Sequence, residues 1–303
     1  MEFHFLGTGS GLPSKQRNVS SLAIRFLNEK SAQWLFDCGE ATQHQLLKSP
    51  ISLAKIEKIF ITHLHGDHIF GLPGLLCSRS AQGATTPLTI FGPDGIQTYV
   101  ETSLAISKSF LSYKIEYVTV EEGLIYNDSS LSVSAKLLDH VIPSYAYKIE
   151  EADKPGKLNV DKLRREGVEP GPIYKRLKDG EVVTLPDGRT LDGKDYVGPP
   201  IKGRVVVIAG DTRPLDSLIS FANEADLLIH EGTFRSDKKE DANEFGHSTI
   251  RDAATLAKRA NVKKLIITHV SSRYANEEKE LLDEARAIFT NCEIAYDLMI
   301  TRI

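Results

Sequence analysis

The chain has 303 residues, of which 41% are hydrophobic and 26% charged, as is typical of a globular protein. Its formal net charge of −4 excludes a broadly basic protein, so a polyanionic partner would have to meet lysines and arginines concentrated in one region. No apolar run approaches the ~18 residues that span a bilayer. The 3 cysteines, Cys38, Cys77 and Cys292, include no CxxC pair, so we expect free thiols and a cytoplasmic protein.

The first segment leads from strand-like sequence into a glycine-rich turn. Phe5-Leu6 is followed by Gly7–Gly11 and then by Lys15, Arg17 and Asn18. Glycine permits a tight turn where a strand ends, and the two cations would then be available to phosphate. A plain glycine turn with solvated charges explains the same residues equally well.

Six later apolar runs lead to an acid or a histidine. Runs rich in β-branched residues predict strands buried on both faces, and polar residues at strand ends mark the functional edge of layered α/β proteins. The runs and the residues after them are Trp34–Phe36 with Asp37, Ile59–Thr62 with His63, Leu137–Leu138 with Asp139-His140, Val205–Ile208 with Asp211, Leu227–Ile229 with His230-Glu231, and Leu265–Thr268 with His269.

Two of these segments are nearly identical. Lys58–His63 reads KIFITH, and Lys264–His269 reads KLIITH. Two copies are too few for a repeat array, and we interpret them as corresponding strands in two similar halves of a sandwich.

The strongest motif is His63-Leu64-His65-Gly66-Asp67-His68. In an extended segment His63 and His65 point the same way and can bind one ion, whereas Asp67 and His68 follow at a turn and can face a second ion. Imidazole and carboxylate ligands suit Zn²⁺, with Mn²⁺ or Fe²⁺ as alternatives. The alternative interpretation is a solvated polar loop.

The stretch 152–201 differs from the rest of the chain. Its dense turn signals predict an inserted arm that leaves and rejoins a single domain of residues 1–303, without a second core. These signals are Pro155-Gly156, Pro170-Gly171-Pro172, Asp179-Gly180, Asp187-Gly188 and Pro199-Pro200. Nearby acids nearly neutralise the basic residues of the arm, which include Lys162, Arg164, Arg165, Lys175, Arg176 and Lys178.

The last third of the chain adds a possible proton donor and two helices. Glu231 could orient His247 for proton transfer, although from the residues alone a surface histidine beside a helix N-cap is the favoured interpretation of His247. Ser248-Thr249 predicts the start of a helix over 250–259, and a second helix is predicted over 276–289. Arg273, shortly after His269, could brace a phosphate or form a structural ion pair.

Together these motifs resemble the metallo-β-lactamase superfamily, with its pattern H-x-H-x-D-H, and within it the ribonuclease Z family. The resemblance covers nearly the whole chain, with Gly232 where the family usually has alanine. It implies an α/β fold, a four-layer αββα sandwich with metals at the sheet edge. It also implies three ligand sets, His63, His65 and His140 for one ion, Asp67, His68 and His269 for the other, and Asp211 for both.

The resemblance further implies a zinc-dependent endonuclease that cuts precursor tRNA after the discriminator base. Two Zn²⁺ per subunit would lower the pKa of water from 15.7 to about 7. Asp67 would accept a proton, and Glu231 with His247 would supply one. The products would be tRNA with a 3′-hydroxyl and a trailer with a 5′-phosphate. The residues implied in substrate binding are Lys15, Arg17, Asn18, Gly171, Pro172, Lys175, Arg176 and Arg273.

Family members commonly form homodimers in which the arm of one subunit holds tRNA for the active site of the other, and no membrane partner is implied. Two rival functions stay open. One is a small-molecule phosphodiesterase or sulfatase on the same fold, which would keep its activity without the arm. The other is a noncatalytic RNA-binding protein, which would bind no zinc.

Overall fold

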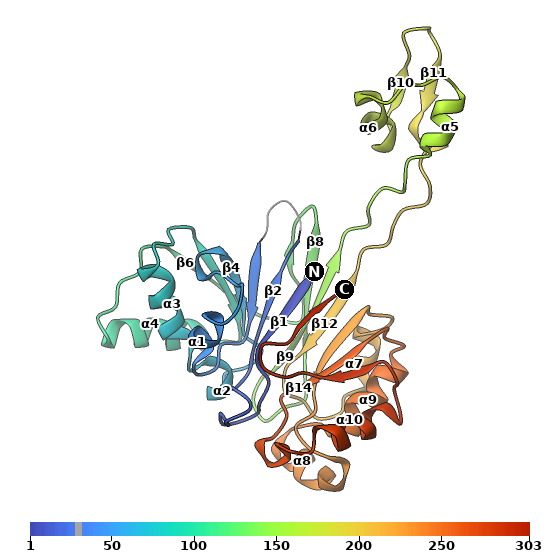
Figure 1. Cartoon of the computed structure of the whole chain (residues 1–303). Helices are drawn as coiled ribbons and strands as arrows, with labels where there is room; N and C mark the ends of the chain where they lie inside the picture. Colours follow the sequence, from blue (N-terminus) through green and yellow to red (C-terminus); the bar gives the residue numbers. More distant parts are fainter. Residues whose placement is uncertain (28–31) are drawn as a thin grey trace. The chain divides into compact units, whose positions relative to one another are not determined.

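A computed structural model describes residues 1–27 and 32–303 of the chain. The chain divides into two compact units. The first comprises residues 1–127, 133–149 and 205–303, and the second comprises residues 128–132 and 150–204. Both large sheets lie in the first unit (Figure 1).

Each large sheet has seven strands. The order of the first sheet is β16 (Ile300–Arg302), β1 (Glu2–Gly7), β2 (Ser21–Arg25), β3 (Gln33–Phe36), β4 (Ile56–Phe60), β5 (Leu88–Gly92) and β6 (Ile115–Thr119). The order of the second is β7 (Gly123–Asn127), β8 (Leu131–Leu137), β9 (Tyr145–Glu151), β12 (Val205–Ala209), β13 (Leu227–Glu231), β14 (Leu265–Thr268) and β15 (Cys292–Ile294). The last four strands of each order pair in parallel.

Helices cover the outer face of each sheet (Figure 1). The helices of the first half are α1 (Thr42–Leu46), α2 (Gly66–Ile69), α3 (Leu72–Ala81) and α4 (Ile96–Ile106). Those of the second half are α7 (Asp216–Phe221), α8 (Lys239–Phe245), α9 (Ile250–Arg259) and α10 (Glu278–Arg286). In the first half Leu75 and Val100 join strand residues Leu35 and Ile59 in one buried cluster. A second cluster joins α7, α9 and α10 to β12–β14, so the layers run helix, sheet, sheet, helix, and the expected αββα sandwich is confirmed.

Aromatic side chains fill the space between the two sheets. Phe60 stacks on Phe36 with ring centroids 4.8 Å apart and meets Tyr147 of the second sheet edge-on at 5.3 Å. Trp34 joins this group, 5.3 Å from Phe60. Such pairs add about 0.5–1.5 kcal/mol each beyond their burial. Because the neighbouring residue Ile59 faces the helices, these strands are buried on both faces, as their continuous apolar runs predict.

The expected correspondence between residues 58–63 and 264–269 is wrong. The strands of the two sheets can be counted from the edge strands β16 and β7, which lie opposite the parallel strands. β4 is then fifth in its sheet and corresponds to β13, whereas β14 is sixth and corresponds to β5. The two sequences are similar because both form central parallel strands with two buried faces. β4 ends at Phe60 and is followed by Ile61, Thr62 and His63, whereas Thr268 is the last residue of β14 and His269 follows it.

The two predicted helices near the C-terminal end of the chain are confirmed. α9 covers the predicted residues 250–259, and α10 covers 278–286, inside the predicted 276–289. Thr249 caps α9, because its side chain accepts the N–H of Asp252 while the Asp252 carboxylate accepts the N–H of Thr249. A cap of this kind contributes about 0.5–2 kcal/mol.

The second unit has a small core of its own, so the expectation of an arm without a core is wrong. Its elements are α5 (Val160–Arg165), α6 (Pro172–Lys178), β10 (Val182–Thr184) and β11 (Thr190–Asp192). Their apolar side chains gather in one buried cluster, Leu163, Val168, Leu177, Val183, Leu185, Leu191 and Tyr196. The turns hide this core in the sequence, because they separate its apolar residues into pieces too short to show a period.

Two simpler expectations concern thiols and membranes. Cys38, Cys77 and Cys292 are free, as expected, and Cys38 and Cys292 are buried. Among the helices of residues 1–27 and 32–303, none is long and apolar enough to cross a membrane.

Candidate active site

The segment after β4 delivers four of the seven predicted ligands. β4 ends at Phe60, and His63 and His65 follow in the segment that joins β4 to α2. Asp67 and His68 lie in the first turns of the short helix α2 instead of in an open turn. Hydrophobic packing of β4 thereby fixes where the segment His63–His68 leaves the sheet. α2 begins after His65 and changes the direction of the chain.

The structure brings His63, His65 and His140 into one group. The Nε2 atom of His63 lies 3.1 Å from Nδ1 of His65, and Nε2 of His140 lies 3.2 Å from the same atom. Burial lowers the pKa of all three imidazoles. Neutral rings with converging nitrogen lone pairs form the donor set that a divalent cation requires.

A second group consists of Asp67, His68 and His269. Nε2 of His269 lies 3.3 Å from both Nε2 of His68 and Oδ2 of Asp67. Although burial opposes the shift, Asp211 and Asp37 raise the pKa of His68 well above its usual value. Positive charge is therefore stabilised here, whether it comes from a proton or from a cation.

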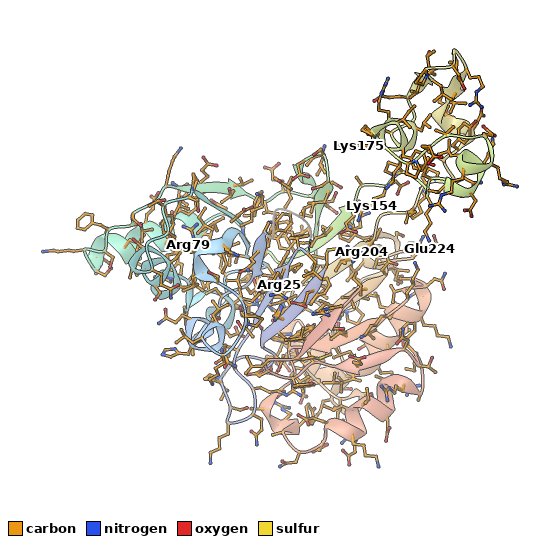
Figure 2. All side chains as sticks on the ribbon, turned by 45° about the horizontal axis from the view of Figure 1, so that its top comes forward. Arg25, Arg79, Lys154, Lys175, Arg204 and Glu224 are labelled. Atoms are coloured by element: carbon orange, nitrogen blue, oxygen red, sulfur yellow. The ribbon has the colours of Figure 1, made fainter. Side chains whose placement is uncertain are left out.

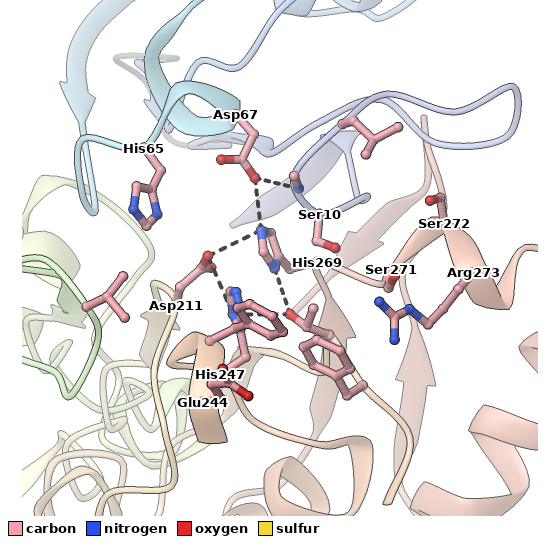
Figure 3. Close-up of a pocket in the computed structure, with 16 residues that line it drawn as sticks. Ser10, His65, Asp67, Asp211, Glu244, His247, His269, Ser271, Ser272 and Arg273 are labelled. Carbon is pink, nitrogen blue, oxygen red and sulfur yellow. Dashed lines mark hydrogen bonds and ion pairs between the residues drawn. The ribbon is translucent and has the colours of Figure 1, made fainter. Parts of the chain in front are cut away.

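Asp211 lies between the two groups (Figure 3). Its Oδ2 is 3.6 Å from Nε2 of His63 in the first group and 3.6 Å from Nε2 of His68 in the second. The side chain is buried, and while burial opposes the shift, His269, His68 and His63 hold the pKa of Asp211 well below its usual value. One carboxylate oxygen is therefore close to the nitrogens of both groups.

Three of these histidines are oriented by a contact on the other ring nitrogen. Nδ1 of His68 lies 2.7 Å from the carboxylate of Asp37. Nδ1 of His269 lies 2.8 Å from the hydroxyl of Thr233, and Nδ1 of His140 lies 2.7 Å from the carbonyl oxygen of Gly246. Contacts of this kind set the tautomer and turn the free nitrogen toward the metal.

The sequence interpretation missed these orienting residues. Asp37 gave the best signal, because it is one of the acids that end a buried strand. Gly246 is required by its left-handed backbone, with φ of 82°, and by a Cβ that would come within 2.7 Å of the His140 ring. Thr233 carried no recognisable signal of its own.

Glu231 and His247 form a contact pair beside these histidines and aspartates. Glu231 is buried, and Oε1 of its carboxylate lies 3.0 Å from Nδ1 of His247. It also accepts the N–H groups of Thr212 and Thr233 and the hydroxyl of Thr233. Burial lowers the pKa of His247, but the Glu231 carboxylate outweighs this and raises it to about 9. The structure thus gives His247 a specific partner, unlike a surface residue beside an N-cap.

These groups open into a cavity of about 630 Å³. Figure 3 shows His65, Asp67, Asp211, His247 and His269 around it. Arg273 lines the same cavity and is exposed, and its guanidinium lies 4.9 Å from the centre of the Phe234 ring. Among the described residues Arg273 has no ion-pair partner, so the interpretation as a structural ion pair is wrong.

Lys15, Arg17 and Asn18, the N-terminal residues expected to bind phosphate, do not line this cavity. Arg17 is buried, and its guanidinium donates to the Thr8 hydroxyl and to Glu278. The expectation that Arg17 offers charge to phosphate is therefore wrong, because these contacts use its donors inside the fold. The side chain of Asn18 donates to the carbonyl oxygen of Glu40 at 2.7 Å, and Lys15 is exposed.

The remaining expected binding residues lie in the second unit. Gly171 precedes α6, Pro172 is its first residue, and Lys175 and Arg176 follow in the same helix. Lys175 lies on the surface of this unit (Figure 2). Arg176 pairs with Glu181 at 2.8 Å.

The chain is similar to known proteins over part or all of its length. The family described as "Anti-Pycsar protein Apyc1" matches residues 1–119. Ribonuclease Z of Listeria monocytogenes serotype 4a (strain HCC23) is 58% identical over 301 residues, 99% of this chain and 98% of that protein.

The chain is also similar to solved structures. Human tRNase Z, short form (ELAC1), is 32% identical with a TM-score of 0.71, and the match covers 100% of this chain and 99% of that one. The metallo-β-lactamase fold protein YhfI of Bacillus subtilis is 20% identical with a TM-score of 0.69, covering 99% and 98% of the two chains. At that identity the second match shows a shared fold alone.

Proposed function

The chain belongs to the ribonuclease Z family, and we propose that it is a metal-dependent endonuclease that removes the 3′ trailer from precursor tRNA. Cleavage follows the discriminator base and leaves a 3′-hydroxyl on the tRNA and a 5′-phosphate on the trailer. The observation that carries this proposal is the convergence of seven histidine and aspartate side chains beside the Glu231–His247 pair, next to a cavity that His65, Asp67, Asp211, His247 and His269 line.

The residues present fit a pair of divalent cations. His63, His65 and His140 would hold one ion, Asp67, His68 and His269 the other, and Asp211 both. Nitrogen and carboxylate donors favour zinc among the common metals. Bound zinc supplies positive charge against the phosphate and makes water acidic enough to lose a proton near neutral pH.

Asp67 faces the cavity in its ionised form. Burial opposes ionisation, but contacts with His269 and His68 lower the pKa of Asp67. One oxygen, Oδ2, also accepts the N–H of Gly11 at 2.7 Å, which holds the carboxylate in place. In this position Asp67 can serve as a ligand and accept the proton of the attacking water.

His247 supplies the proton that the leaving oxygen needs. The leaving group in phosphodiester cleavage is an alkoxide, which departs poorly unless it is protonated. Nδ1 of His247 is held by Glu231, so the other ring nitrogen is the one that can donate. Three donors, the N–H groups of Thr212 and Thr233 and the hydroxyl of Thr233, hold the Glu231 carboxylate in place.

We assign tRNA binding away from the scissile bond to the second unit. α6 carries Lys175 and Lys178, which are three residues apart and lie on one face of the helix. Among the described residues neither has an ion-pair partner, so both are available to phosphate. Such contacts give affinity and salt dependence without reading bases, which suits a folded RNA recognised by its shape.

We also propose a homodimer in which the arm of one subunit holds tRNA for the active site of the other. Mixing a variant that lacks the arm with an Asp211→Ala variant tests this arrangement. Restored cleavage in the mixture supports the arrangement, and cleavage that stays absent while mixed dimers form contradicts it.

The deciding experiment is incubation with a precursor tRNA that carries a 3′ trailer, with and without a chelator, followed by mapping of the product ends. We expect one cut after the discriminator base that disappears with the chelator. Deleting the arm should abolish tRNA cleavage but spare hydrolysis of bis(p-nitrophenyl) phosphate. A small-molecule hydrolase would instead leave precursor tRNA intact, and a noncatalytic protein would bind no zinc.

A further inference from the structure

The cavity over the metal cluster has a polar floor and an apolar rim. The floor consists of Asp67, Asp211 and the histidines, whereas Leu12, Val141 and Phe245 line the same cavity at its mouth. These three side chains are 62%, 52% and 54% exposed. Single exposed apolar residues are ordinary, but three around one catalytic cavity indicate a ligand with an apolar surface.

The backbone of Phe245 is held by the catalytic machinery itself. Phe245 is the last residue of α8, which Gly246 ends in a left-handed conformation. The N–H of His247 donates to the carbonyl oxygen of Ala242 at 2.7 Å, and the Gly246 carbonyl contacts the His140 ring. The ring of Phe245 therefore projects from a fixed point beside the proton donor, although more than half of its surface is exposed.

Three planar side-chain groups, those of Phe245, Phe234 and Arg273, line one wall of the cavity. The ring of Phe245 is parallel to that of Phe234 within 9°, with centroids 6.5 Å apart. Phe234 also lies beneath the guanidinium of Arg273 and 6.0 Å from the ring of His247. Proteins hold unpaired bases of single-stranded RNA by stacking on aromatic rings and guanidinium planes of this kind.

The charge beside Phe245 favours a base over a phosphate. Glu244 precedes Phe245, lines the same cavity and is exposed. A carboxylate repels phosphate but accepts hydrogen bonds from the amino groups of bases. Figure 3 shows Glu244 and His247 on one side of the cavity and Arg273 on the other, so the cation that suits phosphate is separated from this acid.

From these observations we propose that Phe245 binds the substrate by stacking on the base of the discriminator nucleotide, the one whose 3′ oxygen leaves. This inference rests on the proposed function and deepens it. His247 protonates that oxygen. Phe245 precedes His247 by two residues, and both side chains lie beside Phe234. The base of the nucleotide that carries the leaving oxygen is therefore the one that Phe245 can contact. The base must be unpaired to enter the cavity, which restricts cleavage to a single-stranded junction.

The test combines Phe245→Ala with precursor tRNA that has an abasic discriminator nucleotide. Loss of one stacked base costs about 5- to 150-fold in binding or rate. We expect the abasic substrate to slow the wild type by such a factor, and Phe245→Ala to slow cleavage of the normal substrate by a similar factor. On the abasic substrate Phe245→Ala should cleave at almost the same rate as the wild type, because the stacking contact is already absent.

Matched controls separate stacking from damage to the fold. Phe245→Trp should retain cleavage and its sensitivity to the abasic nucleotide, and zinc content should stay unchanged in both variants. Phe110→Ala removes another exposed phenylalanine, 91% exposed and outside this cavity, and should behave as wild type. Independent losses from the two changes, or an undiminished rate in Phe245→Ala, would overturn the inference. If the wild type leaves normal precursor tRNA uncut, the proposed function itself fails.

Discussion

In the first unit the predicted ligands are buried or half-buried and contact one another, whereas in the second unit the lysines of α6 lie on the surface. His63, His68 and Asp211 are at most 3% exposed, and each has partners within 3.6 Å. Lys175 and Lys178 are exposed and lack ion-pair partners among the described residues. Removing one member of the buried network leaves uncompensated charge, whereas an exposed lysine contributes only screened attraction.

The difference assigns separate tasks to the two units. Groups in the buried network have one geometry and therefore decide the chemistry. If the second unit binds tRNA as we propose, its exposed charges should set how tightly, and at what salt concentration, RNA binds. Changes in the two units should consequently alter different measured quantities.

The largest effect is expected from Asp211→Ala, which removes the carboxylate shared by both ligand groups. We expect zinc content to fall and cleavage to decrease more than ~10⁴-fold, because enzymes of this kind rely on accelerations of at least ~10⁶. Metal analysis and single-turnover cleavage measure the two quantities. Asp94→Ala, which removes an exposed acid outside the ligand groups, is the matched control. Full zinc occupancy in Asp211→Ala would show that this carboxylate is not the bridge.

A smaller effect is expected from His247→Ala, which leaves the ligands in place. Cleavage should slow by ~10²–10⁴, the usual contribution of a general acid, while zinc content is retained. Because the pKa of His247 is raised to about 9, its protonated form is present below that pH and is lost as pH rises through it. The wild-type rate should therefore fall near pH 9, and the variant should lack this fall.

His44→Ala provides the control for His247→Ala, since His44 is exposed and lies outside the cavity. It should keep the wild-type rate and pH profile. Normal turnover by His247→Ala would remove this residue from the mechanism.

Asp37→Asn tests how much the contact that orients His68 contributes to zinc affinity. Asp37 has φ of 55°, a conformation that asparagine tolerates, so the backbone should be preserved. Loss of the carboxylate contact with His68 should weaken zinc binding about 10- to 100-fold. Competition with a chromogenic chelator measures this affinity. Unchanged affinity would mean that His68 is oriented without Asp37.

The smallest effect on chemistry is expected from removing Lys175 and Lys178 together. The slope of log binding constant against log salt should become shallower by about 1 for each lysine, and tRNA should bind roughly 10-fold more weakly at low salt. Hydrolysis of bis(p-nitrophenyl) phosphate should be unchanged, because the buried network is untouched. An exposed lysine of the first unit, Lys55, gives the matched control through Lys55→Ala. A loss of small-substrate activity in the double variant would contradict the separation of tasks.

The sequence alone determined which elements form and where reactive residues leave them. The apolar runs identified buried strands, except that Leu137 is exposed at the end of β8 and Leu138 lies beyond it. Thr249 and the residues after it identified α9, and the spacing of residues 63–68 identified the predicted ligand motif. These features depend on neighbours within a few residues, so their periods and caps can be recognised along the chain.

Apart from the ligand sets that the family resemblance implied, only the tertiary structure decided which distant residues meet. Sheet order and register bring Asp37 to His68 and Thr233 to His269, and the end of α8 places Gly246 against His140. The burial of Arg17 and the small core of the arm escaped the sequence interpretation for the same reason. Each depends on contacts between segments far apart in the chain, and one chain's local patterns carry no information about which of those contacts form.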